Sequence, residues 1–169
     1  AWNKKIFKHI QEHVDQASKD LADERGPCPD AADYGYNERF SNKTAIAPTA
    51  SISIICGGAS PGVEPVAANS YTHKTLSGSF NVKNRYLVEL LEKHGKNTDD
   101  VWSGITTNQG SVSHLDFLTD LEKDVFKTAF ELDQKWIIEL SGDRTPFISQ
   151  AQSINLFVPA DIHKRELHK

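Results

Sequence analysis

Segments of helical and strand-like pattern alternate along this chain, and that rhythm limits what it can form. Apolar residues recur every three or four positions in Trp2–Glu24 and in Asn84–His94, which predicts two amphipathic helices. Thr44–Ala47 is a short apolar run and Ser153–Val158 alternates with β-branched and aromatic residues, so both predict strands. Parallel strands of an α/β sheet need neighbours on both sides, and two or three strands cannot close one. We therefore expect an α/β fold that is incomplete on its own.

Three further helices are indicated by their first residues. Residues 119–122, Thr-Asp-Leu-Glu, have the spacing of a capping box and predict a helix that continues to Leu140. Thr98 can cap a short helix, and Asp161 can cap a final one that reaches Lys169. This last helix is short and lacks a terminator, and the chain contains no methionine. We therefore expect a piece of a longer or processed polypeptide.

Composition excludes several functional classes. With 169 residues, 38% of them hydrophobic, the chain predicts a single segment, residues 1–169, rather than two domains. The formal charge of −4 provides no basic field for nucleic acid. No apolar run is long enough for a membrane span and the N-terminus has no signal-peptide pattern, so we expect a cytoplasmic protein. The two cysteines, Cys28 and Cys56, lack metal-ligand spacing, which disfavours a disulfide framework or a zinc site.

The stretch Asn42–Gly58, NKTAIAPTASISIICGG, passes from an apolar run through a proline into small hydroxylated residues. Ser51–Cys56 can be a short helix or a second strand, since periodicity does not separate the two for so short a run. If it is a helix, its first amides lack internal partners and its dipole is positive there, so Pro48–Ser53 can hold a phosphate group. On spacing alone an ordinary capped helix is favoured, because Ser and Thr are good caps. The stretch is not a Walker loop, since no Gly-Lys-Ser/Thr follows.

Other candidate residues have plainer explanations. Cys56 can be a nucleophile or a radical carrier, but a cysteine among apolar neighbours is favoured as a small core residue. His9 and His13 lie four residues apart and can share a helix face, as metal ligands do. Without a third ligand, and with several lysines nearby, they are favoured as surface residues.

Six blocks of the sequence resemble the large, catalytic subunit of class I ribonucleotide reductase, and together they cover essentially the whole chain. The blocks are ERFSNKTAIAPTASISIICGGASPGVEP, KDLADERGPCPDAADYG, YTHKTLSGSFNVKN, KNTDDVWSGITTNQGSVSHLDFLT, EKDVFKTAFELDQKWIIEL and DRTPFISQAQSINLFVPADIHKRELHK. The resemblance implies part of a ten-stranded α/β barrel in which thiyl-radical chemistry reduces ribonucleoside diphosphates to deoxyribonucleoside diphosphates.

The resemblance also implies which residues bind substrate. The family's proline-threonine loop, which holds the substrate diphosphate at a helix N-terminus, is matched by Pro48, Thr49, Ala50, Ser51, Ile52 and Ser53. The turn Gly62–Pro65 matches another family motif and is expected to support that loop. The family's radical cysteine, reducing cysteines, allosteric sites, stacked tyrosines and C-terminal thiol pair fall outside the matched blocks. No catalytic or metal-binding residue is therefore expected in this chain.

The partners and cofactors implied by the resemblance lie outside the chain. They are other fragments of a split or processed large subunit, a small subunit with a dimetal-tyrosyl radical or its equivalent, and thioredoxin or glutaredoxin as reductant. The fragments are expected to bind at the apolar faces of Trp2–Ala22 and Phe126–Leu140. A hypothesis of another class is a non-catalytic nucleotide- or phosphate-binding module derived from the same barrel.

Overall fold

The structure is a computed structural model that describes residues 2–57, 59–75 and 78–168. Its residues form two compact units. The first comprises Ala1–Pro48 and Lys135–Ile154, and the second comprises Thr49–Gln134 and Asn155–Lys169. Gly58, the last residue of the stretch Asn42–Gly58, and Lys169 of the predicted last helix lie outside the described residues. Within the described ranges, no helix combines the length and apolar character that a membrane span needs.

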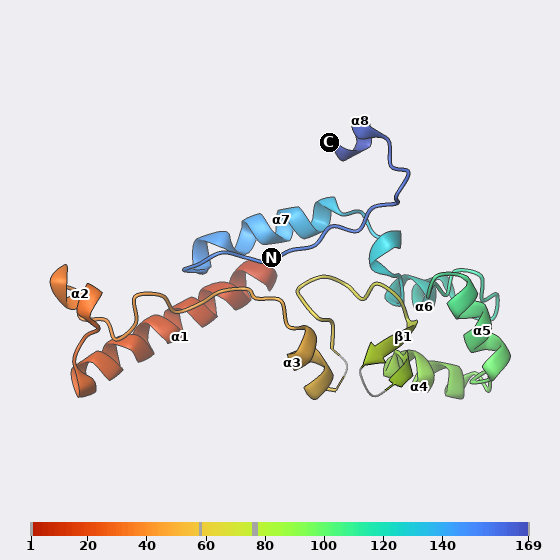
Figure 1. Ribbon diagram of the computed structural model, residues 1–169, viewed down its shortest axis with the longest axis horizontal. Helices are drawn as coiled ribbons and strands as arrows, with labels where there is room; N and C mark the ends of the chain where they lie inside the picture. Colours follow the sequence, from red (N-terminus) through yellow and green to blue (C-terminus); the bar gives the residue numbers. More distant parts are fainter. Residues whose placement is uncertain (1, 58, 76–77, 169) are drawn as a thin grey trace. The chain divides into compact units, whose positions relative to one another are not determined.

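The first unit contains two helices that lie side by side, α1 (Trp2–Arg25) and α7 (Lys135–Arg144) (Figure 1). The Asn3 side chain donates a hydrogen bond to the Leu140 carbonyl at 2.8 Å, and Lys4 pairs with Asp143 at 3.1 Å. The shorter elements are α2 (Pro29–Asp33) and the 3₁₀ turn η2 (Thr145–Phe147). Helix α1 confirms the predicted amphipathic helix almost to the residue.

The prediction of strands at Thr44–Ala47 and Ser153–Val158 is wrong, because neither segment forms a strand in the structure. Ile46 makes only an isolated parallel bridge, and its partner is Gln152. The reason lies in the backbone donors of the second segment. The Asn155 amide donates to the Glu64 side chain and the Phe157 amide to the Gln134 side chain, so neither amide is available for a strand ladder.

The second unit combines one hairpin with short helices. Strands β1 (Ser70–Thr75) and β2 (Gly78–Lys83) pair antiparallel with Ser70 opposite Lys83, a hairpin that the sequence analysis did not predict. The helical elements are α3 (Ala50–Ile55), α4 (Arg85–Lys93), α5 (Asp99–Thr107), α6 (Asp120–Val125), the 3₁₀ turn η1 (Ala129–Glu131) and α8 (Lys164–Leu167). Helix α4 confirms the Asn84–His94 prediction, and the side chain of Asn84 caps it.

Two predicted helix boundaries are wrong. The helix that begins after Thr119 ends at Val125 and does not continue to Leu140. A second capping box, between Thr128 and Glu131, starts a separate turn and interrupts it. At the C-terminal end His163 rather than Asp161 caps α8, through a hydrogen bond that its Nδ1 accepts from the Arg165 amide.

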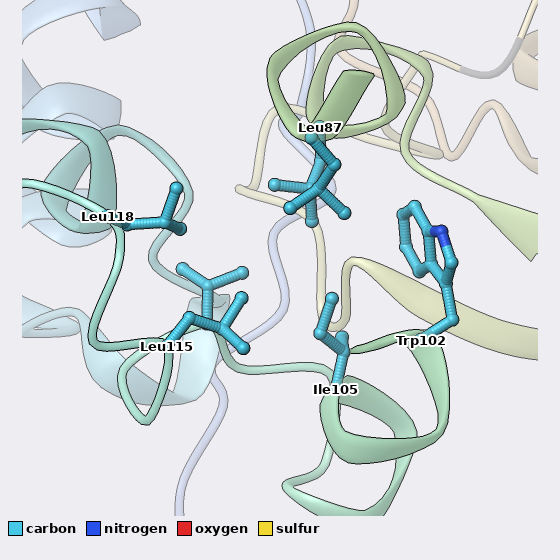
Figure 2. Packing of buried hydrophobic residues seen from close by; sticks show 7 residues of the cluster. Leu87, Trp102, Ile105, Leu115 and Leu118 are labelled. Carbon is cyan, nitrogen blue, oxygen red and sulfur yellow. The ribbon is translucent and has the colours of Figure 1, made fainter. Parts of the chain in front are cut away.

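The core of the second unit is built mainly from α4, α5 and the turns that follow α5. Figure 2 shows Leu87 of α4 and Trp102 and Ile105 of α5 pointing toward Leu115 and Leu118. Leu87 and Ile105 have no exposed surface. Apolar burial stabilises by roughly 25 cal/mol per Å², so this cluster is the main source of stability in the second unit.

A buried asparagine joins the segments around this core. The Nδ2 group of Asn69 donates to the carbonyls of Gly110, at 3.0 Å, and Phe126, at 2.7 Å. Its Oδ1 accepts from Asn84 Nδ2 at 2.9 Å, so every polar group of the side chain has a partner. The close approach needs a glycine at position 110, where φ is +83° and a β-carbon would collide with Ala68.

Replacing Asn69 by Ala removes the side-chain donor of the Phe126 carbonyl and the acceptor of Asn84 Nδ2, while the Gly110 carbonyl keeps its bond from the backbone amide of residue 69. Because an unsatisfied buried polar group costs roughly 1–3 kcal/mol, we expect the free energy of unfolding to fall by about 2–4 kcal/mol. Urea denaturation followed by tryptophan fluorescence measures this change. Asn37→Ala, which removes an exposed hydrogen bond to Asp23, serves as control and should cost less than about 1 kcal/mol. Equal losses in both variants would contradict the role assigned to Asn69.

The capping box at Thr119 is confirmed, and it includes a histidine from another helix. Glu122 Oε2 accepts from the Thr119 amide at 2.8 Å, while Oε1 lies 2.9 Å from His94 Nε2 at the end of α4. The hydrogen bond with His94, followed by those from Thr119, lowers the pKa of Glu122 from 4.5 to about 2. This carboxylate therefore links the start of α6 to the end of α4.

Because the folded pKa of Glu122 lies below its unfolded value, its stabilising contribution is complete above about pH 4.5 and is lost as the pH falls toward 2. Glu122→Gln should therefore be less stable than wild type at pH 7, and the difference should shrink between pH 4.5 and 2. Urea denaturation across this range tests it, with Glu89→Gln on the exposed side of α4 as control. A wild-type minus Glu122→Gln difference that does not change with pH would contradict this assignment.

Candidate functional site

The candidate anion loop, Pro48–Ser53, contains the start of α3. Of the two readings of Ser51–Cys56 that the sequence left open, the structure has the helix. Thr49 is its N-cap residue, although its side chain makes no capping hydrogen bond. Its backbone amide instead donates to the Pro61 carbonyl at 2.8 Å, which fixes the start of the helix against the turn that follows it.

The first amides of α3 face outward. Ala50, Ser51 and Ile52 are exposed, and their amides have no hydrogen-bond acceptor within the described part of the chain. Such amides at a helix N-terminus, together with the positive end of the helix dipole, attract anions. The small side chains of Ala50 and Ser51 leave the backbone open to an approaching ligand.

The remaining residues of the predicted loop are placed differently. Ser53 is buried, and its hydroxyl donates to the Ala50 carbonyl at 2.8 Å. This hydroxyl therefore holds the first turn of α3 together and does not offer a donor to solvent. Pro48 is exposed and ends the first of the two chain segments that form the first unit.

The turn Gly62–Pro65, which the sequence expects to support the loop, contains Glu64, and the polar contacts of Glu64 join this turn to a distant segment. The Ser60 hydroxyl donates to the Glu64 carbonyl at 2.5 Å, and Glu64 Oε1 accepts from the Asn155 amide at 2.5 Å and from Asn155 Nδ2 at 3.1 Å. Glu64 and Asn155 are 91 positions apart, so no local spacing could have revealed the pair.

The cysteines and histidines form no metal site in the described residues. Cys28 and Cys56 are both free thiols, and Cys56 is exposed, contrary to the small core residue favoured from its apolar neighbours. The rings of His9 and His13 lie 4.0 Å apart, and His13 Nδ1 is hydrogen bonded to the His9 carbonyl. Within those ranges, no group of three or more His, Cys, Asp or Glu side chains is placed to hold a metal ion.

Comparison with known proteins places this chain in a family. Residues 30–169 match the family described as "Ribonucleotide reductase, barrel domain". The chain belongs to the ribonucleotide reductase family. Its mixed helices and strands are part of that barrel domain, which confirms the predicted fold class and the resemblance to the large subunit.

Individual relatives support the assignment to ribonucleotide reductase. The ribonucleoside-diphosphate reductase large subunit of Invertebrate iridescent virus 6 is 49% identical over 167 residues, which cover 96% of this chain and 17% of that protein. A putative large subunit of Frog virus 3 is 40% identical over 162 residues, 96% of this chain and 28% of that protein.

A solved structure extends the likeness to three dimensions. The class Id ribonucleotide reductase alpha subunit of Actinobacillus ureae matches with a TM-score of 0.86 and 40% sequence identity, over 98% of this chain and 30% of that one. The chain thus spans less than a third of the length of each of these reductases.

Proposed function

We propose that this chain supplies the substrate diphosphate-binding loop and late barrel elements of a ribonucleotide reductase large subunit. The enzyme reduces ribonucleoside diphosphates to deoxyribonucleoside diphosphates by thiyl-radical chemistry. The observation that carries the proposal is the exposed start of α3, where the Ala50, Ser51 and Ile52 amides have no acceptor in the described part of the chain. Diphosphate oxygens can accept hydrogen bonds from such amides.

The residues of the proposed loop have different tasks. The amides of Ala50–Ile52 and the exposed Ser51 side chain bind the phosphates. Ser53 stabilises the helical turn, since its hydroxyl is bonded to the Ala50 carbonyl. Thr49 anchors the loop through its backbone amide and Pro48 leads into it.

The rest of the large subunit is proposed to cover the apolar faces of this chain. On α1, Trp2 and Ile6 are 76% and 50% exposed, and on α7, Trp136 is 62% exposed. Large side chains left in water on one helix face indicate an interaction surface. These faces correspond to the predicted partner surfaces at Trp2–Ala22 and Phe126–Leu140.

Catalysis is proposed to depend on groups that other chains or segments hold. A small subunit supplies the radical from a dimetal-tyrosyl centre or its equivalent, and thioredoxin or glutaredoxin restores the reducing thiols. The residues of this chain bind and orient the substrate and take no part in electron transfer.

Replacing Ser51 by Glu tests the proposed loop in the assembled reductase. A carboxylate at this position repels the diphosphate, so we expect the KM for cytidine diphosphate to rise by roughly tenfold or more. Ser51→Gln introduces a side chain of the same size as glutamate but without the charge. It is the matched control and should change KM much less.

Two outcomes contradict the proposal. An unchanged KM in Ser51→Glu means that the diphosphate does not bind at this loop. An assembled protein that binds cytidine diphosphate through Ser51 but forms no deoxycytidine diphosphate means that the chain belongs to a non-catalytic phosphate-binding module.

A further inference from the structure

Glu64 is a buried carboxylate that the proposed substrate contacts do not use. It is only 6% exposed, and its Oε1 accepts two hydrogen bonds from one residue, Asn155. A β-carbon on Gly62 would collide with the second oxygen, Oε2, so the backbone at position 62 passes directly against the carboxylate. A buried carboxylate is costly unless its donors are in place, and this one is closely surrounded.

The contacts of Glu64 form part of a continuous path to the anion loop. The Ser60 hydroxyl bonds the Glu64 carbonyl and closes the turn that contains Pro61. The Pro61 carbonyl in turn accepts from the amide of Thr49, the N-cap residue of α3. A shift of Glu64 therefore moves the Pro61 carbonyl, which holds Thr49 in place.

On its other side Glu64 is fixed to the segment that follows residue 154. The Phe157 amide donates to Gln134 Oε1 at 2.8 Å, and Gln134 Nε2 donates to the Ala129 carbonyl at 2.7 Å. The rings of Phe130 and Phe157 meet edge to face, with 5.4 Å between centroids. The segment that contains Asn155 is thus held in place by these contacts, and through Asn155 it fixes the position of the Glu64 carboxylate.

We propose that Glu64 is a positioning residue for substrate binding, which acts through Asn155 and Pro61 to set the place of the anion loop. This inference rests on the proposed function of that loop. The carboxylate does not touch the substrate. Its role is to keep the Ala50–Ile52 amides where the diphosphate oxygens bind, and small misplacements of binding groups are costly.

The test is made in the assembled reductase, with KM and kcat measured separately for cytidine diphosphate. Glu64→Ala removes both acceptor bonds to Asn155, and we expect KM to rise roughly tenfold while kcat at saturating substrate changes less than about threefold. Glu64→Gln keeps a side-chain oxygen that can accept from Asn155 and should recover most of the affinity. Glu89→Gln, on the exposed side of α4, is the control for loss of a glutamate charge.

Exchanging the carboxylate and the amide between residues 64 and 155 conserves side-chain volume. It therefore separates an effect on the position of the loop from an effect on folding. Asn155→Asp places a second carboxylate against Glu64 and should raise KM. Adding Glu64→Gln should restore it, because the glutamine amide can then donate to the new aspartate. If Glu64→Ala does not fold, the KM values of Asn155→Asp and of the double variant test the inference in its place. The same KM in wild type, Asn155→Asp and the double variant overturns the inference, as does a fall in kcat with no change in KM.

The Ser51→Glu variant distinguishes substrate binding by the loop from positioning of the loop by Glu64. If it raises KM while the Glu64 and Asn155 variants do not, the loop binds substrate but Glu64 does not position it. If Ser51→Glu leaves KM unchanged, the proposed function fails and the inference about Glu64 fails with it.

Discussion

The side-chain amide of Asn69 is the contact on which the second unit depends, because it joins segments that no regular ladder connects. It has no exposed surface and bonds the turn after α5, the end of α6 and the residue that caps α4. The apolar cluster around Leu87 and Ile105 comes from α4, α5 and the turns that follow α5. A glycine at position 110 is what allows the backbones to come so close. The polar contact fixes the geometry, and apolar burial supplies most of the stability.

The candidate loop depends on the same kind of constraint at a smaller scale. Helix α3 has six residues, too few to be stable by itself, so its position must come from tertiary contacts. Those contacts are hydrogen bonds from behind, through Pro61 and Glu64 to Asn155. The front of the helix is left open, with Ala50 and Ser51 exposed. Hydrogen bonds fix α3 on one side, and its first residues are exposed on the other. This arrangement suits a site that binds an anion through backbone amides.

Helices with strong local signals could be predicted from the sequence, and elements that depend on distant partners could not. Helix α1 and the Thr119 capping box are local patterns, and both were found. The predicted strand at Ser153–Val158 failed because Glu64 and Gln134 take the amides that a ladder needs. The interruption at Thr128 was visible in principle, since Thr128 and Glu131 repeat the spacing of Thr119 and Glu122.

The loop shows the same division. The sequence proposes Pro48–Ser53 as the loop and the turn Gly62–Pro65 as its support, but the inward hydroxyl of Ser53 and the contact of Glu64 with Asn155 could not be predicted, because both depend on folded contacts. Family membership places the chain in the ribonucleotide reductase barrel, and the diphosphate site is the proposal that gives the loop its function. A structure of the assembled reductase with bound cytidine diphosphate tests this most directly. We expect phosphate oxygens about 3 Å from the amides of Ala50–Ile52. A diphosphate bound away from the start of α3 would contradict it.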